Sequence, residues 1–255
     1  MGKRVAIVTG ASGGLGKEFV KLMLQEDLDE IWAIARNQEK LKELKQELGN
    51  RVLIFSRDLT QSEQVHSIRE LLLDQSPEIV YLVNNAGIGK MGTYQDFSVE
   101  EIEATITINC SAVAALCALC IPYMKRGSRI LNISSQASFQ PVAYINLYAA
   151  TKAFVRSYSR ALNLELKSTG ITVTSVCPGW VDTDLLMKES NGEPINFPAL
   201  VTAKRVADKA MKDAKRGKDM SVCTLFVKGM HLFVKVFPQK MVMQSYARSL
   251  EKYLE

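Results

Sequence analysis

The feature of this 255-residue sequence that most constrains its fold is a regular alternation of short apolar runs with amphipathic segments, which continues to about residue 177. The apolar runs have the length of buried strands, and the segments between them have the period of helices. Such alternation predicts a single α/β domain with a doubly wound parallel sheet covered by helices on both faces. The expected strands are 5–9, 31–35, 52–56, 79–83, 130–134 and 172–177, and the clearest expected helices are 17–25, 38–48, 62–73 and 149–167.

Composition excludes several other classes of protein. The chain is 47% hydrophobic and 23% charged, as ordinary globular domains are, and it shows no internal repeat or linker. The apolar run after the N-terminus is too short for a signal peptide, and Lys228 and Lys235 interrupt the most apolar region before it reaches the length of a membrane span. We therefore expect a cytoplasmic protein, with one domain over residues 1–220.

The pattern of cysteines and histidines favours packed side chains over a redox or metal site. Five cysteines are an odd number, and the C-x-x-C formed by Cys117 and Cys120 has neither a second pair nor a histidine cluster beside it. We interpret all five as reduced thiols and this pair as part of a packed helix. His66 and His231 have no partner at metal-binding spacing, so we expect no metal site.

A glycine-rich turn follows the first expected strand, with the sequence TGASGGLG from Thr9 to Gly16. Glycines allow a tight turn into a helix and let phosphate oxygens approach the backbone N–H groups at its positive end. The turn is not a Walker A loop, because Glu18 follows Lys17 where Ser or Thr would hold magnesium. Taken alone, it is either a phosphate site or a turn without a ligand.

Further motifs follow in a fixed order: NNAG over 84–87, then Asn109, Ser135, YAATK over 148–152 and PGWVDT over 178–183. Together with the TGxxxGxG turn, this set resembles the short-chain dehydrogenase/reductase family, over residues 4 to about 183. The resemblance implies a Rossmann-like fold and an enzyme that transfers hydride between a nicotinamide cofactor and a CH–OH or ketone carbon. The order of the motifs carries the argument, since a tyrosine four residues before a lysine is common by chance.

Tyr148 and Lys152 are four residues apart, so on a helix their side chains reach the same ligand. A free tyrosine is a poor base at neutral pH, and we expect the nearby ammonium to lower its pKa so that Tyr148 acts as general acid/base. The resemblance implies that Lys152 also binds the nicotinamide ribose, that Ser135 orients the substrate oxygen and that Asn109 holds a water in a proton relay. Asn109 could instead cap or kink its helix, and Ser135 could be a turn residue.

The expected cofactor is NADP(H). An NAD site places an acid at the end of the second strand, but here Ala35 stands there and Arg36 follows, where it can pair with a 2′-phosphate. The alternative is that Arg36 is only a solvated residue at the start of a helix. The resemblance implies a cofactor site made of Gly10, Ser12, Gly14, Leu15, Gly16, Arg36, Asp58, Leu59, Asn85, Ala86, Gly87, Tyr148, Lys152, Pro178, Gly179, Val181 and Thr183.

The last part of the chain departs from the family pattern. We expect a substrate loop over 182–200 and a basic, apolar helical extension over 221–255, packed on the same domain or on a partner; residues 200–255 contain twelve Lys/Arg and five Asp/Glu. Many relatives end with a short seventh strand and a glycine pair, whereas this chain continues through an apolar segment. As a helix that segment has one polar stripe, formed by Thr224, Lys228, His231 and Lys235. Its apolar surface must cover the substrate pocket, pack on a second subunit or lie in a membrane interface through 222–243.

The sequence thus predicts an NADP(H)-dependent oxidoreductase that interconverts a secondary alcohol and a ketone on a hydrophobic substrate, such as a steroid or lipid-like carbonyl compound. The alternative is a catalytically silent dinucleotide sensor or scaffold. We expect a homodimer or homotetramer and no nucleic-acid partner, because the basic tail is interleaved with acids and has no aromatic stacking platform.

Overall fold

The computed structural model describes residues 2–183, 186, 189–190, 193–195 and 197–251. Its centre is a seven-stranded sheet in which every pair of neighbours is parallel. From one edge to the other the strands are β11 (Met220–Ser221), β6 (Thr172–Val176), β5 (Met124–Ile133), β4 (Glu78–Asn84), β1 (Arg4–Thr9), β2 (Glu30–Ala35) and β3 (Val52–Ser56). The chain moves outward from β1 in both directions, which defines a doubly wound sheet.

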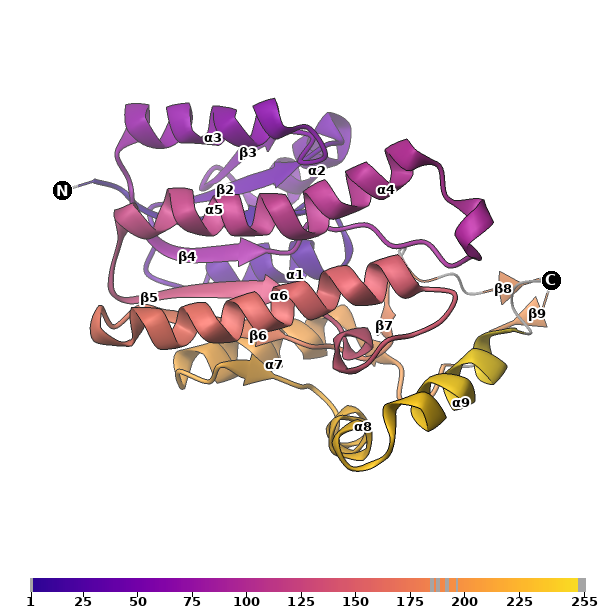
Figure 1. The fold of residues 1–255 in the computed structure, drawn as a ribbon. Coiled ribbons are helices and arrows are strands. Elements are labelled where there is room, and N and C mark those ends of the chain that lie inside the picture. The colour runs from indigo at the N-terminus through magenta and orange to yellow at the C-terminus, as the bar shows by residue number, and fades with distance from the viewer. Residues whose placement is uncertain (1, 184–185, 187–188, 191–192, 196, 252–255) are drawn as a thin grey trace.

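Two layers of helices cover the sheet (Figure 1). One face carries α1 (Gly14–Met23), α2 (Gln38–Leu48) and α7 (Ala203–Lys215), and the other carries α3 (Ser62–Gln75), α4 (Val99–Ile106), α5 (Ala112–Cys120) and α6 (Asn146–Glu165). The shorter elements are η1 (Tyr94–Asp96), η2 (Thr107–Ser111), η3 (Ile121–Tyr123), η4 (Gln136–Phe139) and η5 (Leu166–Ser168), and the two-residue strands β7 (Val181–Asp182), β8 (Glu189–Ser190), β9 (Glu193–Pro194) and β10 (Val201–Thr202).

The strand sequences explain why both faces are buried. In β1, Val5 and Ile7 point into the core shared with α3 and α5, whereas Ala6 and Val8 point into the core shared with α1 and α7. Side chains alternate between the faces of a sheet, so a strand covered on both sides has a continuous apolar sequence. The apolar runs were correctly interpreted as strands of this kind.

One long helical segment is apolar along most of its length. Within the described part of the chain, the continuous helical segment Val99–Tyr123 is the one that is long and apolar enough, by length and composition, to cross a membrane. By this measure of length and apolar composition, it exceeds the C-terminal region, which we took from the sequence as the most apolar part of the chain. In this fold it is a core helix, because Leu116 and Cys117 are fully buried against the sheet.

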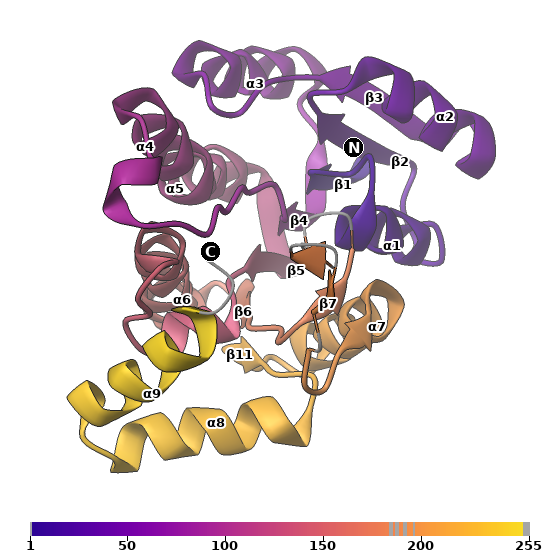
Figure 2. The ribbon, with the colours of Figure 1, turned by 90° about the vertical axis from the view of Figure 1, so that its right-hand side faces the viewer.

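The C-terminal extension forms α8 (Leu225–Val236) and α9 (Gln239–Glu251). Figure 2 shows the two helices below the edge of the sheet and beside η4 and α6. Our expectation that the chain lacks a short seventh strand is wrong, since β11 pairs with β6 before the extension begins. Thr224 caps α8 by accepting from the Val227 N–H at 3.2 Å, and the helix ends just before Pro238.

Most predicted elements lie within a few residues of the observed ones. β3 and α2 coincide with their predicted ranges, whereas β5 begins six residues before the predicted start at 130. Its pairing with β4 is irregular at Ile79, so this first part of the strand does not continue the regular apolar pattern. The substrate loop predicted over 182–200 contains β8 and β9, and its positions 184–185, 187–188, 191–192 and 196 lie outside the described residues.

Candidate active site

The motif residues gather where the strands of the sheet end. The chain leaves β1 toward β2 on one side and leaves β4 toward β5 on the other, so the connections depart in opposite directions from the carboxyl ends of these two neighbouring strands. A crevice at such a switch point is where doubly wound folds bind their ligands. Figure 2 looks onto the carboxyl ends of the strands, with α1 on one side of them and α4 and α6 on the other.

The glycine turn has the geometry of a phosphate cradle. Gly10 and Gly14 have positive φ angles of 63° and 50°, a conformation that other residues rarely adopt. A Cβ at Gly13 would meet no atom within 4 Å, so the turn faces open space there. Helix α1 begins with no side-chain cap and no acidic residue in its first turn, which leaves its N–H groups and its positive end available to an anion.

Thr9 and Asn85 hold this turn in place from beneath. The Thr9 hydroxyl accepts from the Asn85 and Ala86 N–H groups at 3.0 Å each, and the Asn85 amide donates to the carbonyl oxygens of Thr9 and Gly10 at 3.1 and 3.2 Å. A Cβ at Gly16 would lie 2.1 Å from the Gly10 oxygen. The NNAG motif is therefore a brace for the turn, and Thr9 is a part of the brace that the sequence reasoning did not single out.

Arg36 lies at the carboxyl end of β2 and is exposed. Asp29 and Glu30 lie at the opposite end of the strand: Asp29 accepts from the Arg4 N–H at 2.7 Å, and Glu30 pairs with Lys3. Glu39, three residues after Arg36 on α2, pairs with Lys42 at 2.8 Å. No carboxylate among the described residues forms an ion pair with Arg36. Its guanidinium is therefore available to an anionic group at this end of the strand.

Tyr148 and Lys152 lie on the first turns of α6 and face the same space. The Lys152 Nζ atom is 5.6 Å from the centre of the Tyr148 ring and donates to the Ile133 carbonyl oxygen at 2.9 Å. Gly89 passes so close to the ring that a Cβ there would lie 2.6 Å from Tyr148 Cδ2. At Gly87 a Cβ would lie 3.2 Å from Lys152 Nζ. The two glycines allow the chain after β4 to pass directly over the pair.

The pKa of Tyr148 differs from our expectation. Burial of the phenol raises its pKa above the ordinary value of 10, and a hydrogen bond with the Ser135 hydroxyl offsets this only in part. The expectation that Lys152 lowers this pKa is therefore wrong for this arrangement, because desolvation outweighs every other effect on the phenol. Tyr148 is consequently protonated at neutral pH and able to donate a proton.

Burial shifts the pKa of Lys152 in the opposite direction from that of Tyr148. Burial lowers the pKa of its ammonium from 10.5 to about 8. The folded protein thus binds fewer protons on this side chain than the unfolded chain does between about pH 8 and 10.5, so Lys152 makes the free energy of unfolding rise with pH across that window. Below pH 8 the buried charge destabilises the fold.

Replacing Lys152 with Met is therefore expected to raise the free energy of unfolding at pH 7. We expect about 1–3 kcal/mol, since each unit of pKa shift corresponds to about 1.4 kcal/mol and the Ile133 oxygen loses its donor. Urea titrations of wild type and variant at pH 7 and pH 9.5 measure this, and the difference between them should shrink at the higher pH. Lys40→Met, at an exposed position on α2, is the control. A Lys152→Met protein less stable than wild type at pH 7 would contradict the assignment.

Asn109 and Ser135 are both held by the backbone of neighbouring loops. Asn109 is fully buried in η2, a π-helical segment, and it exchanges hydrogen bonds with Ile88, donating to the carbonyl oxygen at 2.8 Å and accepting from the N–H at 3.0 Å. The wide π turn points its amide inward, and such turns are frequent at functional sites. Ser135 begins η4, and its hydroxyl accepts from the Ala137 N–H at 3.2 Å.

The remaining predicted residues lie around the same strand ends. The Asp58 carboxylate accepts from the Thr60 N–H at 3.0 Å, and Leu59 is buried in the core beside α3. Pro178 and Gly179 follow β6, and the Pro178 oxygen accepts from the Gln136 N–H at 2.8 Å. Val181 lies in β7, and Thr183 lies against the glycine turn, since a Cβ at Gly14 would be 3.2 Å from its methyl carbon. Ser12 and Leu15 belong to the turn itself, with the Leu15 side chain in the core.

One wall of the site comes from residues that the sequence reasoning did not name. Tyr246 and Leu250 of α9 pack with Tyr148 in a cluster that also contains Val142 and Ile145. Helix α8 contributes to the site less directly. Its Val227 lies beneath Gly179, and a Cβ on Gly179 would be 2.8 Å from a methyl carbon of Val227. The extension thus covers the site through α9, and α8 supports the segment after β6.

The cysteines do not form a redox centre. Cys117 and Cys120 are both fully buried on α5, and burial raises the pKa of the Cys117 thiol to about 12. Cys117 and Cys120 thus pack in the core as interpreted, and Cys110 and Cys223 are only partly buried. Among the described residues no group of three potential metal ligands occurs.

Comparison with known proteins gives a consistent result. The model of the short chain dehydrogenase family matches residues 4–194. An uncharacterized oxidoreductase of Staphylococcus epidermidis is 31% identical over 193 residues, covering 75% of this chain and 84% of that protein. A very-long-chain 3-oxoacyl-CoA reductase of Anas platyrhynchos is 35% identical, covering 71% of this chain and 60% of that protein. The solved structure of a short-chain dehydrogenase from Sphingobium yanoikuyae in complex with NADPH is 26% identical, covers 99% of this chain and 96% of its own, and has a TM-score of 0.76.

The fold and the motif residues therefore define a nicotinamide-dependent oxidoreductase. The chain belongs to the short-chain dehydrogenase/reductase family and is an enzyme acting on CH–OH or ketone groups. A nicotinamide dinucleotide fits the residues present: the glycine cradle and the uncapped start of α1 suit its phosphates, and Tyr148 and Lys152 lie beside the carboxyl ends of the neighbouring strands β4 and β5.

Proposed function

We propose that this enzyme reduces the ketone of a bulky hydrophobic substrate with NADPH, and that it oxidises the corresponding secondary alcohol in the reverse direction. The observation that carries the proposal is the geometry of Tyr148, a partly buried residue whose phenol hydrogen-bonds Ser135 and lies close to the Lys152 ammonium. A protonated phenol in an apolar pocket is suited to donate a proton to a carbonyl oxygen. When bound, the cofactor supplies the hydride.

The roles of the chain's own residues follow from their contacts. Tyr148 donates the proton to the substrate oxygen, and Ser135, which already hydrogen-bonds this phenol, orients that oxygen. The Lys152 ammonium is held 5.6 Å from the ring, where it stabilises the phenolate left after the transfer. Asn109 fixes the loop after β4 through its two hydrogen bonds with Ile88, and we expect it to hold the water of the proton relay.

The preference for NADP(H) rests on Arg36. Its guanidinium is exposed at the end of β2, whereas Asp29 and Glu30 are engaged at the opposite end of the strand and Glu39 pairs with Lys42. A guanidinium forms paired, charge-assisted hydrogen bonds with a phosphate and has no such gain with a ribose hydroxyl. The NADPH in the Sphingobium yanoikuyae structure is in accord with this preference.

The hydrophobic substrate is inferred from the wall beside Tyr148. Tyr148 shares one apolar cluster with the buried Val142 and the partly buried Ile145, Tyr246 and Leu250, and these last three can offer apolar surface to a carbonyl compound. An apolar wall of this kind favours long or bulky substrates over small polar ones. The Anas platyrhynchos relative, whose name specifies a very-long-chain substrate, is consistent with that inference.

A panel of ketones tests both parts of the proposal. NADPH oxidation should be fast with steroid and long-chain 3-oxo substrates and slow with acetone-sized ones. Tyr246→Ala is expected to raise KM for the long substrates about tenfold, because one aromatic contact is lost, and to leave kcat/KM for small ketones nearly unchanged. Arg248→Ala, at an exposed position of α9, should change neither.

Two outcomes would count against the proposal. An equal loss of activity toward small and large ketones in Tyr246→Ala would show that the residue supports the fold instead of the substrate. A wild-type protein that binds NADPH but oxidises it with no member of the panel would favour the silent sensor.

A further inference from the structure

Helix α8 exposes an apolar face to solvent. Leu225, Leu232 and Val236 form one helical stripe and are 83, 64 and 69% exposed. Phe226, Phe233 and Phe237 form the adjacent stripe and are 46, 38 and 43% exposed. We expected this helix to bury most of its surface, and within the described chain Val227 is the one residue of α8 that is fully buried. Contiguous exposed apolar surface of this kind marks an interaction site.

The orientation of α8 is fixed by contacts on its other side. Val227 lies beneath Gly179, and the His231 ring stacks on Phe139 with ring centres 4.3 Å apart. Thr224 is buried as the cap of the helix. Half of the polar stripe recognised in the sequence therefore faces the domain, which turns the two apolar stripes outward. Figure 1 shows α8 and α9 at the lower margin of the molecule, beyond the two helical layers.

The charges around this face have one sign. From residue 220 to residue 250 the chain contains Lys228, Lys235, Lys240 and Arg248 and no Asp or Glu. Lys228 and Lys235 are seven residues apart, so they follow one flank of α8 beside the apolar stripe. Long lysine side chains in that position can lay their methylenes along an apolar surface while their ammonium groups reach anionic groups nearby.

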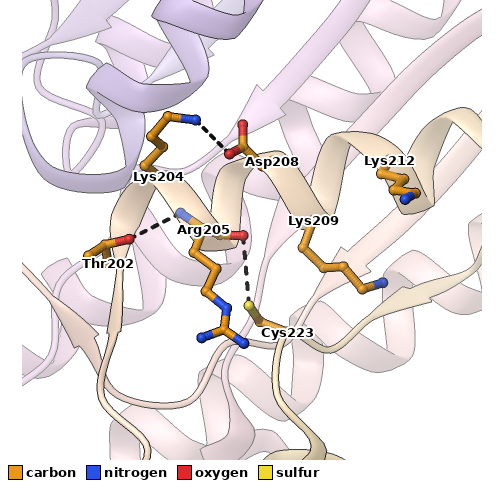
Figure 3. A pocket seen from close by; sticks show the side chains of 7 residues that line it. All are labelled: Thr202, Lys204, Arg205, Asp208, Lys209, Lys212 and Cys223. Atoms are coloured by element: carbon orange, nitrogen blue, oxygen red, sulfur yellow. Dashed lines mark hydrogen bonds and ion pairs between the residues drawn. The ribbon is translucent and has the colours of Figure 1, made fainter.

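The basic surface continues from α8 onto α7. A shallow hollow of about 440 Å³ is lined by Thr202, Lys204, Arg205, Asp208, Lys209, Lys212 and Cys223 (Figure 3). Lys204 is paired with Asp208 at 2.7 Å, whereas Arg205 and Lys212 have no carboxylate partner among the described residues. A second hollow between this region and α8 is lined by Lys209, Asp213, Lys218 and Lys228 among others; Lys209 and Lys218 are paired with Asp213, and Lys228 is exposed.

We propose that the outward face of α8, with the turn into α9, docks on the surface of an anionic lipid bilayer. The phenylalanine and leucine side chains would enter the boundary between headgroups and acyl chains, and the flanking lysines would contact the headgroup phosphates and carboxylates. A second copy of this chain on the same face would bring Lys228, Lys235 and Lys240 against the same three cations, so charge complementarity favours the lipid surface. The inference does not depend on the cofactor or substrate of the enzyme.

Vesicle co-sedimentation of the full chain tests the proposal. We expect binding to vesicles of phosphatidylcholine mixed with phosphatidylserine and little binding to phosphatidylcholine alone, with a loss on addition of salt. Leu232→Ser/Val236→Ser should weaken binding at least about tenfold, since two exposed apolar contacts are removed. Lys228→Glu/Lys235→Glu should weaken it by about twentyfold or more, because each basic residue near the surface contributes about fivefold.

Matched variants distinguish vesicle binding through this face of α8 from nonspecific adsorption. Leu73→Ser/Leu164→Ser changes two equally exposed leucines, at 60 and 72%, on α3 and α6 and should bind as wild type does. Lys40→Glu/Lys42→Glu on α2 is the corresponding charge control. The proposal is overturned if wild type does not sediment with anionic vesicles. It is also overturned if light scattering shows a dimer without lipid that Leu232→Ser/Val236→Ser dissociates, because a second copy would then cover the face.

Discussion

Tyr148→Phe is expected to lower kcat/KM for ketone reduction about 10³-fold, because a positioned proton donor contributes about 10² to 10⁴ and the phenylalanine ring has none to give. NADPH binding and the melting temperature should stay close to wild type, since the ring itself packs against Tyr246, Leu250 and their neighbours and is retained. Stopped-flow absorbance of NADPH and fluorescence titration of binding measure the two quantities separately.

Tyr158→Phe is the matched control for this variant. Tyr158 lies on the same helix, stacked on Phe154 with ring centres 5.8 Å apart, on the side of α6 away from the strand ends. Its loss of a hydroxyl should change turnover by less than about threefold. If Tyr148→Phe kept more than about a tenth of wild-type activity, the proton would have to come from another group and the proposed role of Tyr148 would be wrong.

Arg36→Asp is expected to change the ratio of kcat/KM for NADPH to that for NADH by about 10² to 10³ in favour of NADH. The substitution removes a charge-assisted pair with the 2′-phosphate, worth about 1.5–3 kcal/mol, and puts a carboxylate near that phosphate. The same carboxylate can accept hydrogen bonds from the two ribose hydroxyls of NADH. Parallel assays with both cofactors measure the ratio.

Arg69→Asp makes the same charge change at an exposed position of α3 and should leave the ratio unchanged. An unaltered NADPH/NADH ratio in Arg36→Asp would mean that this arginine is a solvated residue at the start of α2. Because Arg36 is remote from the proton donor, kcat with saturating cofactor should be little affected, which separates this result from a failure of the catalytic assignment.

Sequence patterns predicted the scaffold well because the signals involved are local. The continuous apolar runs of β1, β2 and β3 occur in strands buried on both faces, and the glycine turn depends on φ angles that only its own residues determine. Helix α5 was harder to recognise because it is apolar on nearly every side, so no helical period shows in its sequence. Helix α7 has a clear apolar face against α1 and was missed all the same.

The properties of the site that were missed depend on residues far apart in the sequence. Tyr148, whose pKa burial raises, lies in one apolar cluster with Tyr246 and Leu250, about a hundred positions later. The periodicity of α8 showed a polar stripe, but no local rule says which stripe a helix turns toward its own domain. His231 faces inward because Phe139 offers it a ring to stack on, and that contact exists only in the folded chain.

Hydrogen bonds to main-chain carbonyl oxygens hold the site residues in place. Lys152 is tied to the Ile133 carbonyl, Asn109 to Ile88 and Asn85 to the glycine turn, all of them within the strand-and-helix framework. Under the proposed function, part of the surface beside the substrate comes instead from an appendage after Ser221, through Tyr246 and Leu250. That part of the substrate wall is thus encoded apart from the proton-transfer residues, so it can change by recombination or drift while they stay intact.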